Sequence, residues 1–455
     1  MEIYNIAYNL YVQDGEHEPK QMTNFTPVIE TAYYPLESSQ DDIPAYLGIQ
    51  LILEDGSVRS LTLPMTSNLA RTIVAEEPRA VLLKTGYAPL VQKYIVDQLS
   101  KTGRSGECQR GVYLPGNGTY RLADGQHVTV WNGRVAGSTK LEVPYMIKPT
   151  NTYRITNSID RPVPTLVRTL LENDAALVLP VAYALLVSRR DVLTAEQHPL
   201  QGGLYITGVQ SSGKTTLARR VFGYTERIGI PGKAALVLEA VSTEASVRDT
   251  LSENPGCVVI IDDLAHSSSR TIEAHRKKLG GAMLRLAANE GDSTKKGKTG
   301  KTDHRDCTSG IALTAEFVLD GVSELTRSIF VYLEKKLNLT EDVRPALIGA
   351  ILEDFADWFA DNYEHAIELL HKIADSPDIL KNLRVDGADE FTELLTRERR
   401  IQDNLALLQW AFVCMVEMIK STVKLSPHRE QALYEKFWMA VHLSVSKQVD
   451  EFAKI

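Results

Sequence analysis

The sequence predicts an α/β fold whose core is a parallel sheet, with a β-rich N-terminal domain before it and an α-helical C-terminal domain after it. Short apolar runs alternate with helical stretches between residues 156 and 335, which is typical of parallel strands buried on both faces. Turn signals separate strand-like runs before residue 155, and helix-compatible segments fill the chain from residue 336. The predicted domains are therefore 1–155, 156–335 and 336–455.

Composition limits the classes of protein that fit. The 455 residues are 44% hydrophobic and 24% charged, which is ordinary for a soluble globular protein. No apolar run approaches the ~20 residues that a membrane span needs. The closest, Leu405–Met418, carries Gln409 and Glu417, so we expect a buried helix and no membrane partner. The net charge of −8 implies that any contact with nucleic acid is local.

The cysteines and the N-terminus predict a cytoplasmic protein. The four cysteines lie far apart and form no CxxC pair, which argues against a cysteine zinc site and a disulfide framework. The first residues have no basic start followed by an apolar stretch, so we expect no signal peptide.

The N-terminal domain shows strands and turns. Asp55-Gly56, Asp124-Gly125 and Asn132-Gly133 each stand between strand-like runs, as two-residue hairpin turns do. Residues 97–110 resemble a loop. The region shows no catalytic constellation, and we interpret it as an accessory or oligomerisation module.

In the central domain an apolar, helix-compatible lead-in over residues 164–192 is followed by alternating strands and helices. The expected strands are Leu204–Thr207, Ala234–Leu238, Cys257–Ile261, Gly310–Thr314 and Ile329–Leu333. In the C-terminal domain, apolar residues at helical spacing form two faces that we expect in the core. These faces comprise Leu352, Phe355 and Phe359, and Leu405, Leu408, Phe412 and Met415.

A glycine-rich motif, Gly208-x-x-x-x-Gly213-Lys214-Thr215, stands between a predicted strand and a predicted helix. Backbone N–H groups of such a loop bind the phosphates of ATP, the lysine neutralises their charge and the threonine hydroxyl binds Mg²⁺. The helix adds its positive dipole end. We therefore expect a P-loop NTPase fold, with these nucleotide-binding residues: Gly208, Ser211, Ser212, Gly213, Lys214, Thr215 and Thr216.

The second motif is an apolar strand that ends in two acids, Asp262 and Asp263, at the distance expected of a Walker B strand. Asp262 is predicted to hold Mg²⁺ together with Thr215, and Asp263 to orient and deprotonate the attacking water. A second acid favours a hydrolysing motor over a metabolic kinase.

Three further catalytic candidates follow. Thr314 ends the next strand and is a candidate sensor of the γ-phosphate, with Glu316 just beyond it; Thr314 could instead only cap the strand. The sensor assignment assumes that this strand lies between the strands of the two motifs. Arg327 precedes the last strand and is a candidate arginine finger toward a neighbouring subunit. The alternative is a surface arginine in an ion pair.

Together these motifs resemble the AAA+ ATPases, over about residues 165–335. The pattern is most similar to superfamily III viral helicases, minichromosome-maintenance helicases and the helicase-like ATPases of bacterial mobile elements. Two features depart from the family. The second acid is Asp263 where most members have Glu, and no sensor-2 arginine can be placed; the candidates are Arg397, Arg399 and Arg400.

The segment before the sensor strand points to the helicase clade. A helix is expected over 270–288, followed by a lysine-rich stretch with glycines over 289–305. In this clade a β-hairpin there projects into the central channel and grips the DNA backbone. Clustered lysines suit phosphate contact, although a solvated surface loop is the plain alternative. The candidate nucleic-acid residues are Lys295, Lys296, Lys298, Lys301 and His304.

The main hypothesis is thus an ATP- and Mg²⁺-dependent DNA helicase or translocase in replication of a mobile element. It would act as a homo-oligomer, expected to be a hexamer, with single-stranded DNA in its channel. The alternative is a regulatory or remodelling ATPase that acts on a protein partner in transposition or phage defence.

Overall fold

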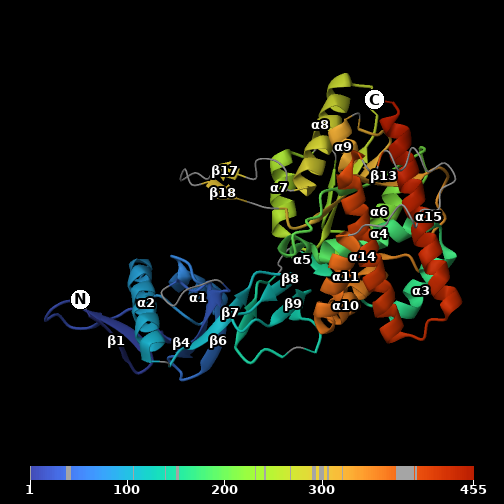
Figure 1. Ribbon diagram of the computed structural model, residues 1–455. Coiled ribbons are helices and arrows are strands. Elements are labelled where there is room, and N and C mark those ends of the chain that lie inside the picture. Colours follow the sequence, from blue (N-terminus) through green and yellow to red (C-terminus); the bar gives the residue numbers. More distant parts are fainter. Residues whose placement is uncertain are drawn as a thin grey trace. The chain divides into compact units, whose positions relative to one another are not determined.

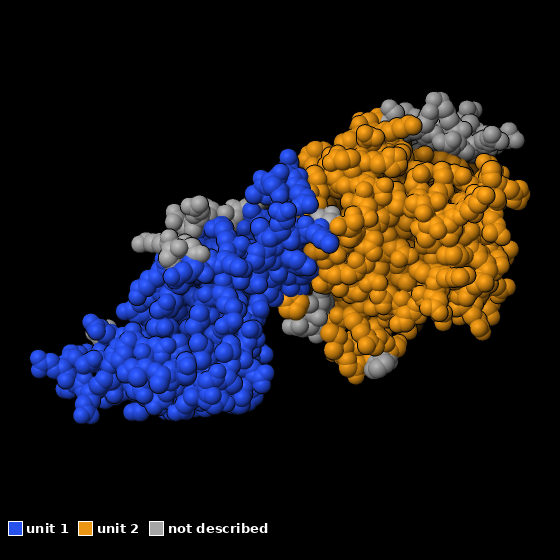
Figure 2. Space-filling model, turned by 90° about the horizontal axis from the view of Figure 1, so that it is seen from below, with its two compact units in different colours: residues 1–115, 121–126, 140–148 blue, residues 116–120, 127–139, 149–455 orange. Residues whose placement is uncertain are grey.

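The structure is a computed structural model in which the chain forms two compact units (Figures 1 and 2). Residues 1–115, 121–126 and 140–148 make the first unit, and residues 116–120, 127–139 and 149–455 make the second. The C-terminal helices thus belong to the same unit as the central sheet. The structure describes residues 2–36, 42–105, 107–138, 140–149, 153–230, 232–239, 242–266, 268–288, 294–296, 302–304, 307–319, 321–375, 394 and 397–454.

The first unit is built on a five-stranded sheet in the order β11-β7-β4-β5-β6. These strands are β4 (Phe25–Pro35), β5 (Tyr46–Leu53), β6 (Val58–Pro64), β7 (Gln109–Leu114) and β11 (Tyr145–Ile147). A second sheet contains β1 (Glu2–Ile6), β2 (Asn9–Gln13) and β3 (Lys20–Gln21). The predicted turn at Asp55-Gly56 joins β5 and β6, and Gly56 has a φ of 75° that favours glycine, although the connection is longer than the two residues predicted.

The prediction of a loop over residues 97–110 is wrong. Helix α2 (Ala88–Ser105) continues through most of it, and β7 begins at Gln109. Val91 and Ile95 lie one helical turn apart and are fully buried in the core of this unit. This burial outweighs the low helix propensity of the glycine and serines at the end of the segment. The unit also contains α1 (Leu69–Glu76) and the short 3₁₀ helix η1 (Thr85–Tyr87).

The two-residue turn predicted at Asn132-Gly133 is confirmed, and it connects β9 (His127–Trp131) to β10 (Arg134–Val135). Asp124-Gly125 also lies in a turn, between β8 (Gly118–Arg121) and β9, but this connection is longer than the two residues predicted. Asn132 and Gly133 both have positive φ, as this kind of turn requires. A further pair, β12 (Tyr153–Ile155) and β14 (Thr225–Arg227), is antiparallel.

The central sheet of the second unit has five parallel strands in the order β15-β16-β19-β13-β20. They are β13 (Gly203–Gly208), β15 (Val237–Glu239), β16 (Val258–Leu264), β19 (Gly310–Ala315) and β20 (Ser328–Leu333). All five predicted strands are present, although β15 is shorter and begins later than expected. As predicted, β19 lies between β13 and β16, so the carboxyl ends of these three strands meet at one edge.

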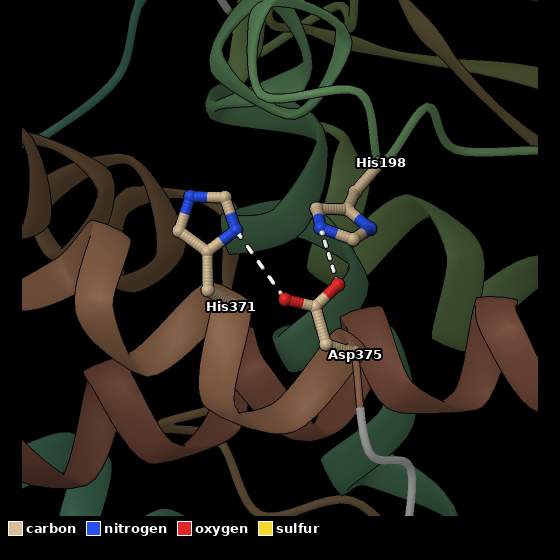
Figure 3. A group of neighbouring side chains, drawn as sticks. All are labelled: His198, His371 and Asp375. Atoms are coloured by element: carbon tan, nitrogen blue, oxygen red, sulfur yellow. Dashed lines mark ion pairs between the residues drawn. The ribbon is translucent and has the colours of Figure 1, made fainter.

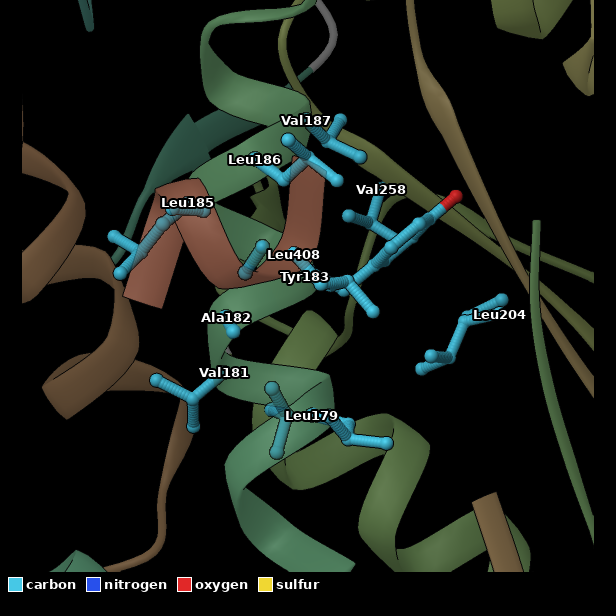
Figure 4. Close-up of a cluster of buried hydrophobic side chains, with 14 of the residues drawn as sticks. Leu179, Val181, Ala182, Tyr183, Leu185, Leu186, Val187, Leu204, Val258 and Leu408 are labelled. Atoms are coloured by element: carbon cyan, nitrogen blue, oxygen red, sulfur yellow. The ribbon is translucent and has the colours of Figure 1, made fainter. Parts of the chain in front are cut away.

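The predicted helical lead-in forms α3 (Pro162–Glu172), the 3₁₀ helix η2 (Ala175–Leu177), α4 (Val178–Ser188) and α5 (Arg190–Ala195). Every residue of α4 is buried, as expected of a helix that is apolar on all sides. Figure 4 shows Tyr183 of α4 among Leu204 of β13, Val258 of β16 and Leu408. Helix α4 thus fills the core behind the sheet.

Around the sheet, α6 (Lys214–Phe222) contacts β13, β16 and β19, and α8 (Arg270–Ala287) contacts β16 and β19. Helix α8 is the helix predicted over 270–288. The remaining helices are α7 (Glu244–Glu253), α9 (Val322–Thr326), α10 (Pro345–Asp361), α11 (Tyr363–Ala374), α14 (Arg399–Thr422) and α15 (Pro427–Phe452). Both predicted apolar faces, on α10 and α14, are buried.

Among the described residues, α14 is long and apolar enough by length and composition to cross a membrane. Its apolar window is 67% buried inside the fold, and it packs against α4, α11 and β20. It is therefore a core helix, as predicted for Leu405–Met418.

Between α8 and β19 the chain forms a β-hairpin, as predicted. β17 (Thr294–Lys296) and β18 (Thr302–His304) pair antiparallel, with Lys295 opposite Asp303. Lys298 and Lys301 lie outside the described residues, as do the side chains of Lys295, Lys296 and His304.

Candidate nucleotide-binding site

The glycine-rich loop connects the carboxyl end of β13 to the first turn of α6. Gly208 has a φ of 151°, and a Cβ atom there would overlap the carbonyl oxygen of Leu333 on β20. Gly213, the N-cap of α6, has a φ of 97°, and Ser211 has a φ of 61°. These conformations explain both glycines. They turn the loop so that the amino end of α6, with its free N–H groups, faces the edge of the sheet.

Lys214 is the first residue of α6 and is buried. Its Nζ atom donates hydrogen bonds to the carbonyl oxygens of Gly208 and Val209, at 3.0 and 2.9 Å. Burial lowers the pKa of Lys214, and the nearby carboxylate of Glu316 opposes this shift. The Oγ atom of Ser212 is buried with no hydrogen-bond partner within the described part of the chain. The loop thus offers a cation and an unpaired hydroxyl to a ligand.

Asp262, on β16, contacts polar side chains of two other elements, α6 and β19. Its Oδ1 atom accepts hydrogen bonds from Thr215 Oγ1 of α6, at 2.9 Å, and from Thr314 Oγ1 of β19, at 2.6 Å. Its Oδ2 atom pairs with Nη2 of Arg219, at 3.0 Å. The hydroxyl of Thr215 and the carboxylate of Asp262 are hard oxygen donors, the kind that Mg²⁺ binds. The two predicted magnesium ligands are therefore adjacent.

The carboxylates of Asp262 and Asp263 have different surroundings because β16 bulges at these two residues. The pairing of β16 with β19 shifts register between Ile261 and Leu264, and Asp263 has a φ of 69°. Bulges often aim a side chain next to active sites. Here the carboxylate of Asp263 is exposed, while its backbone N–H donates to Thr314 Oγ1 at 3.0 Å.

A cavity of about 280 Å³ lies at this edge of the sheet. Asp263, Thr314 and Glu316 line this cavity together with the glycine-rich loop and Lys214. The structure therefore brings together eleven of the twelve catalytic and nucleotide-binding residues predicted from the sequence, counting Asp262 through its bonds to Thr215 and Thr314 and Gly208 through its bond to Lys214. The cavity is lined by Ser211, Ser212, Gly213, Lys214, Thr215, Thr216, Asp263, Leu264, Thr314, Ala315 and Glu316.

Thr314 is held within the site by both acids. A hydroxyl has one proton to donate, and Thr314 donates it to Asp262 while accepting from the backbone of Asp263. This geometry favours a role in positioning the two acids. Direct contact of Thr314 with a phosphate stays a prediction.

Arg327 does not lie with the other candidates. It ends α9, and its carbonyl oxygen accepts from Gly203 N at the amino end of β13, whereas the glycine-rich loop follows the carboxyl end. At about 3.3 Å per residue, the strand separates the two by about 17 Å. The guanidinium of Arg327 bonds to Ser323, and burial lowers its pKa, as do the charges of Arg400 and Arg285. Arg327 therefore cannot act on the nucleotide of its own chain.

A solved structure shares this architecture. A structure of an active SCCmec type IV Cch helicase matches 98% of this chain and 79% of its own chain, with a TM-score of 0.59 and 11% identity. The chain has the fold of this helicase. A structure of inhibitor-bound JCV helicase covers 58% of this chain and 65% of its own at 10% identity, but its TM-score of 0.22 carries no argument. No protein-family model and no curated protein matches the sequence.

Besides the residues predicted, this helicase-like fold brings Arg219 to the site, and sequence reasoning missed it. Arg219 stands four residues after Thr215 on α6, so both side chains lie on one face of the helix and both reach Asp262. That spacing was the only signal in the sequence.

The sensor-2 candidates lie on or near α14. Arg400 donates to Gln201 and Thr326 beside Arg327, at the amino end of the sheet. Arg397 pairs with Glu398, and Arg399 lies near Asp403. None of these three lines the cavity at the glycine-rich loop.

Proposed function

We propose that the chain is an ATP-driven DNA helicase or translocase of the AAA+ type that works as a homo-oligomeric ring, with a hexamer expected. The observation that carries the proposal is the convergence of Lys214, Thr215, Asp262 and Asp263 at one edge of a parallel sheet, with β19 between the two motif strands. The helicase fold and the hairpin β17–β18 just before β19 support the choice of helicase.

The residues of the site divide the work on ATP. Lys214 neutralises the phosphates, and backbone N–H groups at the start of α6 bind their oxygens. Thr215 and Asp262 hold Mg²⁺, which when bound neutralises charge on the transferred phosphoryl group. Asp263 accepts the proton of the attacking water, and its exposure in the cavity leaves its carboxylate accessible. Thr314 keeps both acids in place, and Glu316 lies beside Lys214.

The position of Arg327 supports a ring. Because it lies at the amino end of β13, it could complete a nucleotide site only in a neighbouring subunit. Arg327 and Arg400 add positive charge that suits a neighbour's phosphates, whereas Arg285 pairs with Glu324 at 2.8 Å. The hairpin lysines would contact the backbone of single-stranded DNA in the channel. We infer that the protein acts in the cytoplasm and serves the replication of a mobile element.

The test is ATP hydrolysis by the purified protein with and without single-stranded DNA. Lys214→Ala should lose ATP binding. Asp263→Asn should bind ATP but not hydrolyse it, and asparagine tolerates the left-handed backbone of Asp263. If Lys214→Ala bound ATP with parental affinity, the assignment of the nucleotide site would be wrong. If DNA did not stimulate hydrolysis, the helicase proposal would be wrong and the remodelling ATPase would be favoured.

A further inference from the structure

A cluster of two histidines and one aspartate lies in the second unit, apart from the nucleotide site (Figure 3). His198 follows α5, His371 is on the last turn of α11, and Asp375 ends that helix. The Oδ1 atom of Asp375 is 3.4 Å from Nε2 of His198, and its Oδ2 atom is 3.8 Å from Nδ1 of His371. One ligand atom from each residue lies within 4.8 Å of those from the other two.

The surroundings of His371 match those of a metal ligand. While its Nδ1 atom faces Asp375, its Nε2 atom lies 3.2 Å from Oε2 of Glu196. A histidine that binds a metal usually donates its other ring N–H to a carboxylate in this way, which fixes the tautomer and the orientation of the ring. Glu196 is on the segment that carries His198, so it orients His371 toward that side of the cluster.

We infer that His198, His371 and Asp375 form a binding site for a divalent transition-metal ion such as Zn²⁺. Two imidazoles and a carboxylate suit zinc rather than Mg²⁺ or Ca²⁺, which prefer oxygen ligands. Neighbouring ligand atoms of a tetrahedral zinc site are about 3.3 Å apart. The contacts of 3.4 and 3.8 Å are near this spacing, and rotation of the His371 side chain, which is 44% exposed, can bring the imidazoles together. Three protein ligands leave a fourth position for water.

The ion would connect two parts of the second unit. His198 stands five residues before Gly203, the first residue of β13, and the other two ligands end α11. Bound metal therefore fixes the end of α11 to the segment that leads into the sheet. A ligand that binds only the folded form stabilises it, so Zn²⁺ should raise the melting temperature.

The test uses the full chain without a histidine tag, treated with a chelator and then dialysed. Zn²⁺ is titrated by calorimetry in excess Mg²⁺ and without nucleotide, and Co²⁺ binding is followed by visible absorption, which reports tetrahedral coordination. We expect saturable binding of a single ion per chain. His198→Ala and His371→Ala should each weaken it at least tenfold. The control is His365→Ala, because His365 is exposed on the same helix α11.

Each result decides the proposal. Loss of binding in the two histidine variants, with parental binding in His365→Ala and unchanged circular dichroism, supports the site. No saturable binding by the parent overturns it. Undiminished binding by the double variant of His198 and His371 also overturns it, because the ion then binds elsewhere, for example at a cysteine.

Discussion

Arg219 forms an ion pair with Asp262, the residue that we assign to Mg²⁺, with Nη2 3.0 Å from Oδ2. The guanidinium and the metal ion would compete for the same carboxylate. The side chain of Arg219 is 59% exposed, so it can swing into solvent at little cost, since exposed ion pairs contribute about 1 kcal/mol or less.

Arg219→Ala should therefore lower the Mg²⁺ concentration that gives half-maximal ATP hydrolysis, by about two- to fivefold for a pair of this strength. A Mg²⁺ titration at saturating ATP measures it. Arg168→Ala is the matched control, because Arg168 forms an exposed ion pair with Asp342 away from the site. A higher Mg²⁺ requirement in Arg219→Ala would show that Arg219 orients Asp262 instead.

Thr314→Val should reduce ATP turnover by about 10- to 100-fold, because misplacing catalytic groups has effects of this size, and should leave the KM for ATP nearly unchanged. Valine keeps the shape but removes the hydroxyl that links Asp262 to the backbone of Asp263. Thr314→Ser, which keeps the hydroxyl, should retain most activity. Steady-state kinetics distinguishes the roles: a raised KM at unchanged kcat would indicate direct contact with the nucleotide.

Arg327→Ala should bind ATP and hydrolyse it poorly. A mixture of this variant with Lys214→Ala should recover activity, because one interface then pairs an intact nucleotide site with an intact Arg327. The measurement is hydrolysis after subunit exchange, with exchange verified by labelled subunits. If the mixture were no more active than its components, the prediction that Arg327 acts on the nucleotide of a neighbouring subunit would be wrong.

Replacing Lys295, Lys296, Lys298 and Lys301 together by alanine should weaken DNA binding of all sequences alike. Each lost phosphate contact should reduce the slope of log affinity against log salt by about 0.7 on single strands. Stimulation of hydrolysis by DNA should be lost, while basal hydrolysis stays.

The control for this variant removes the same charge from exposed positions in the first unit. If it changes the salt slope as much as the hairpin variant, or if the hairpin variant binds and unwinds DNA like the parent, the hairpin is an ordinary surface segment. The control positions are Lys93, Lys101, Lys140 and Lys148.

Asp354→Asn should stabilise the protein above pH 6. Burial, aided by the charges of Asp357 and Glu353, raises the pKa of Asp354 from 3.8 to about 6. The folded form therefore binds the proton more tightly, and stability is lost as pH rises from about 4 to about 6. Asparagine avoids this loss of folding free energy, which we expect to be about 1 kcal/mol because solvent screens the half-buried carboxylate. Melting temperatures of both proteins across this range check it; a gain of equal size at pH 4 would contradict it.

Much of the central sheet was predictable because its signals are local. The short, β-branched run Val258–Ile261, which ends in two acids, indicates a buried strand, and the glycines at 208 and 213 occupy backbone conformations that other residues avoid. The order of β13, β19 and β16 was assumed for the sensor assignment, and the structure has this order. The end of helix α2 was missed because Ser100, Gly103 and Ser105 favour a loop, and only the packing of Val91, Ile95 and Leu99 in the core of the first unit shows why the helix persists.

The five central strands and most residues of the nucleotide site can be predicted from the sequence, since turn geometry and apolar runs act over a few residues. The contacts of those side chains depend on the tertiary structure. Arg219 meets Asp262 because α6 packs on β16, Arg327 lies at the opposite end of β13 because the strands are parallel, and His198 meets His371 because the end of α11 lies beside the segment that follows α5. Such contacts depend on packing between segments far apart in the chain, which no local pattern specifies.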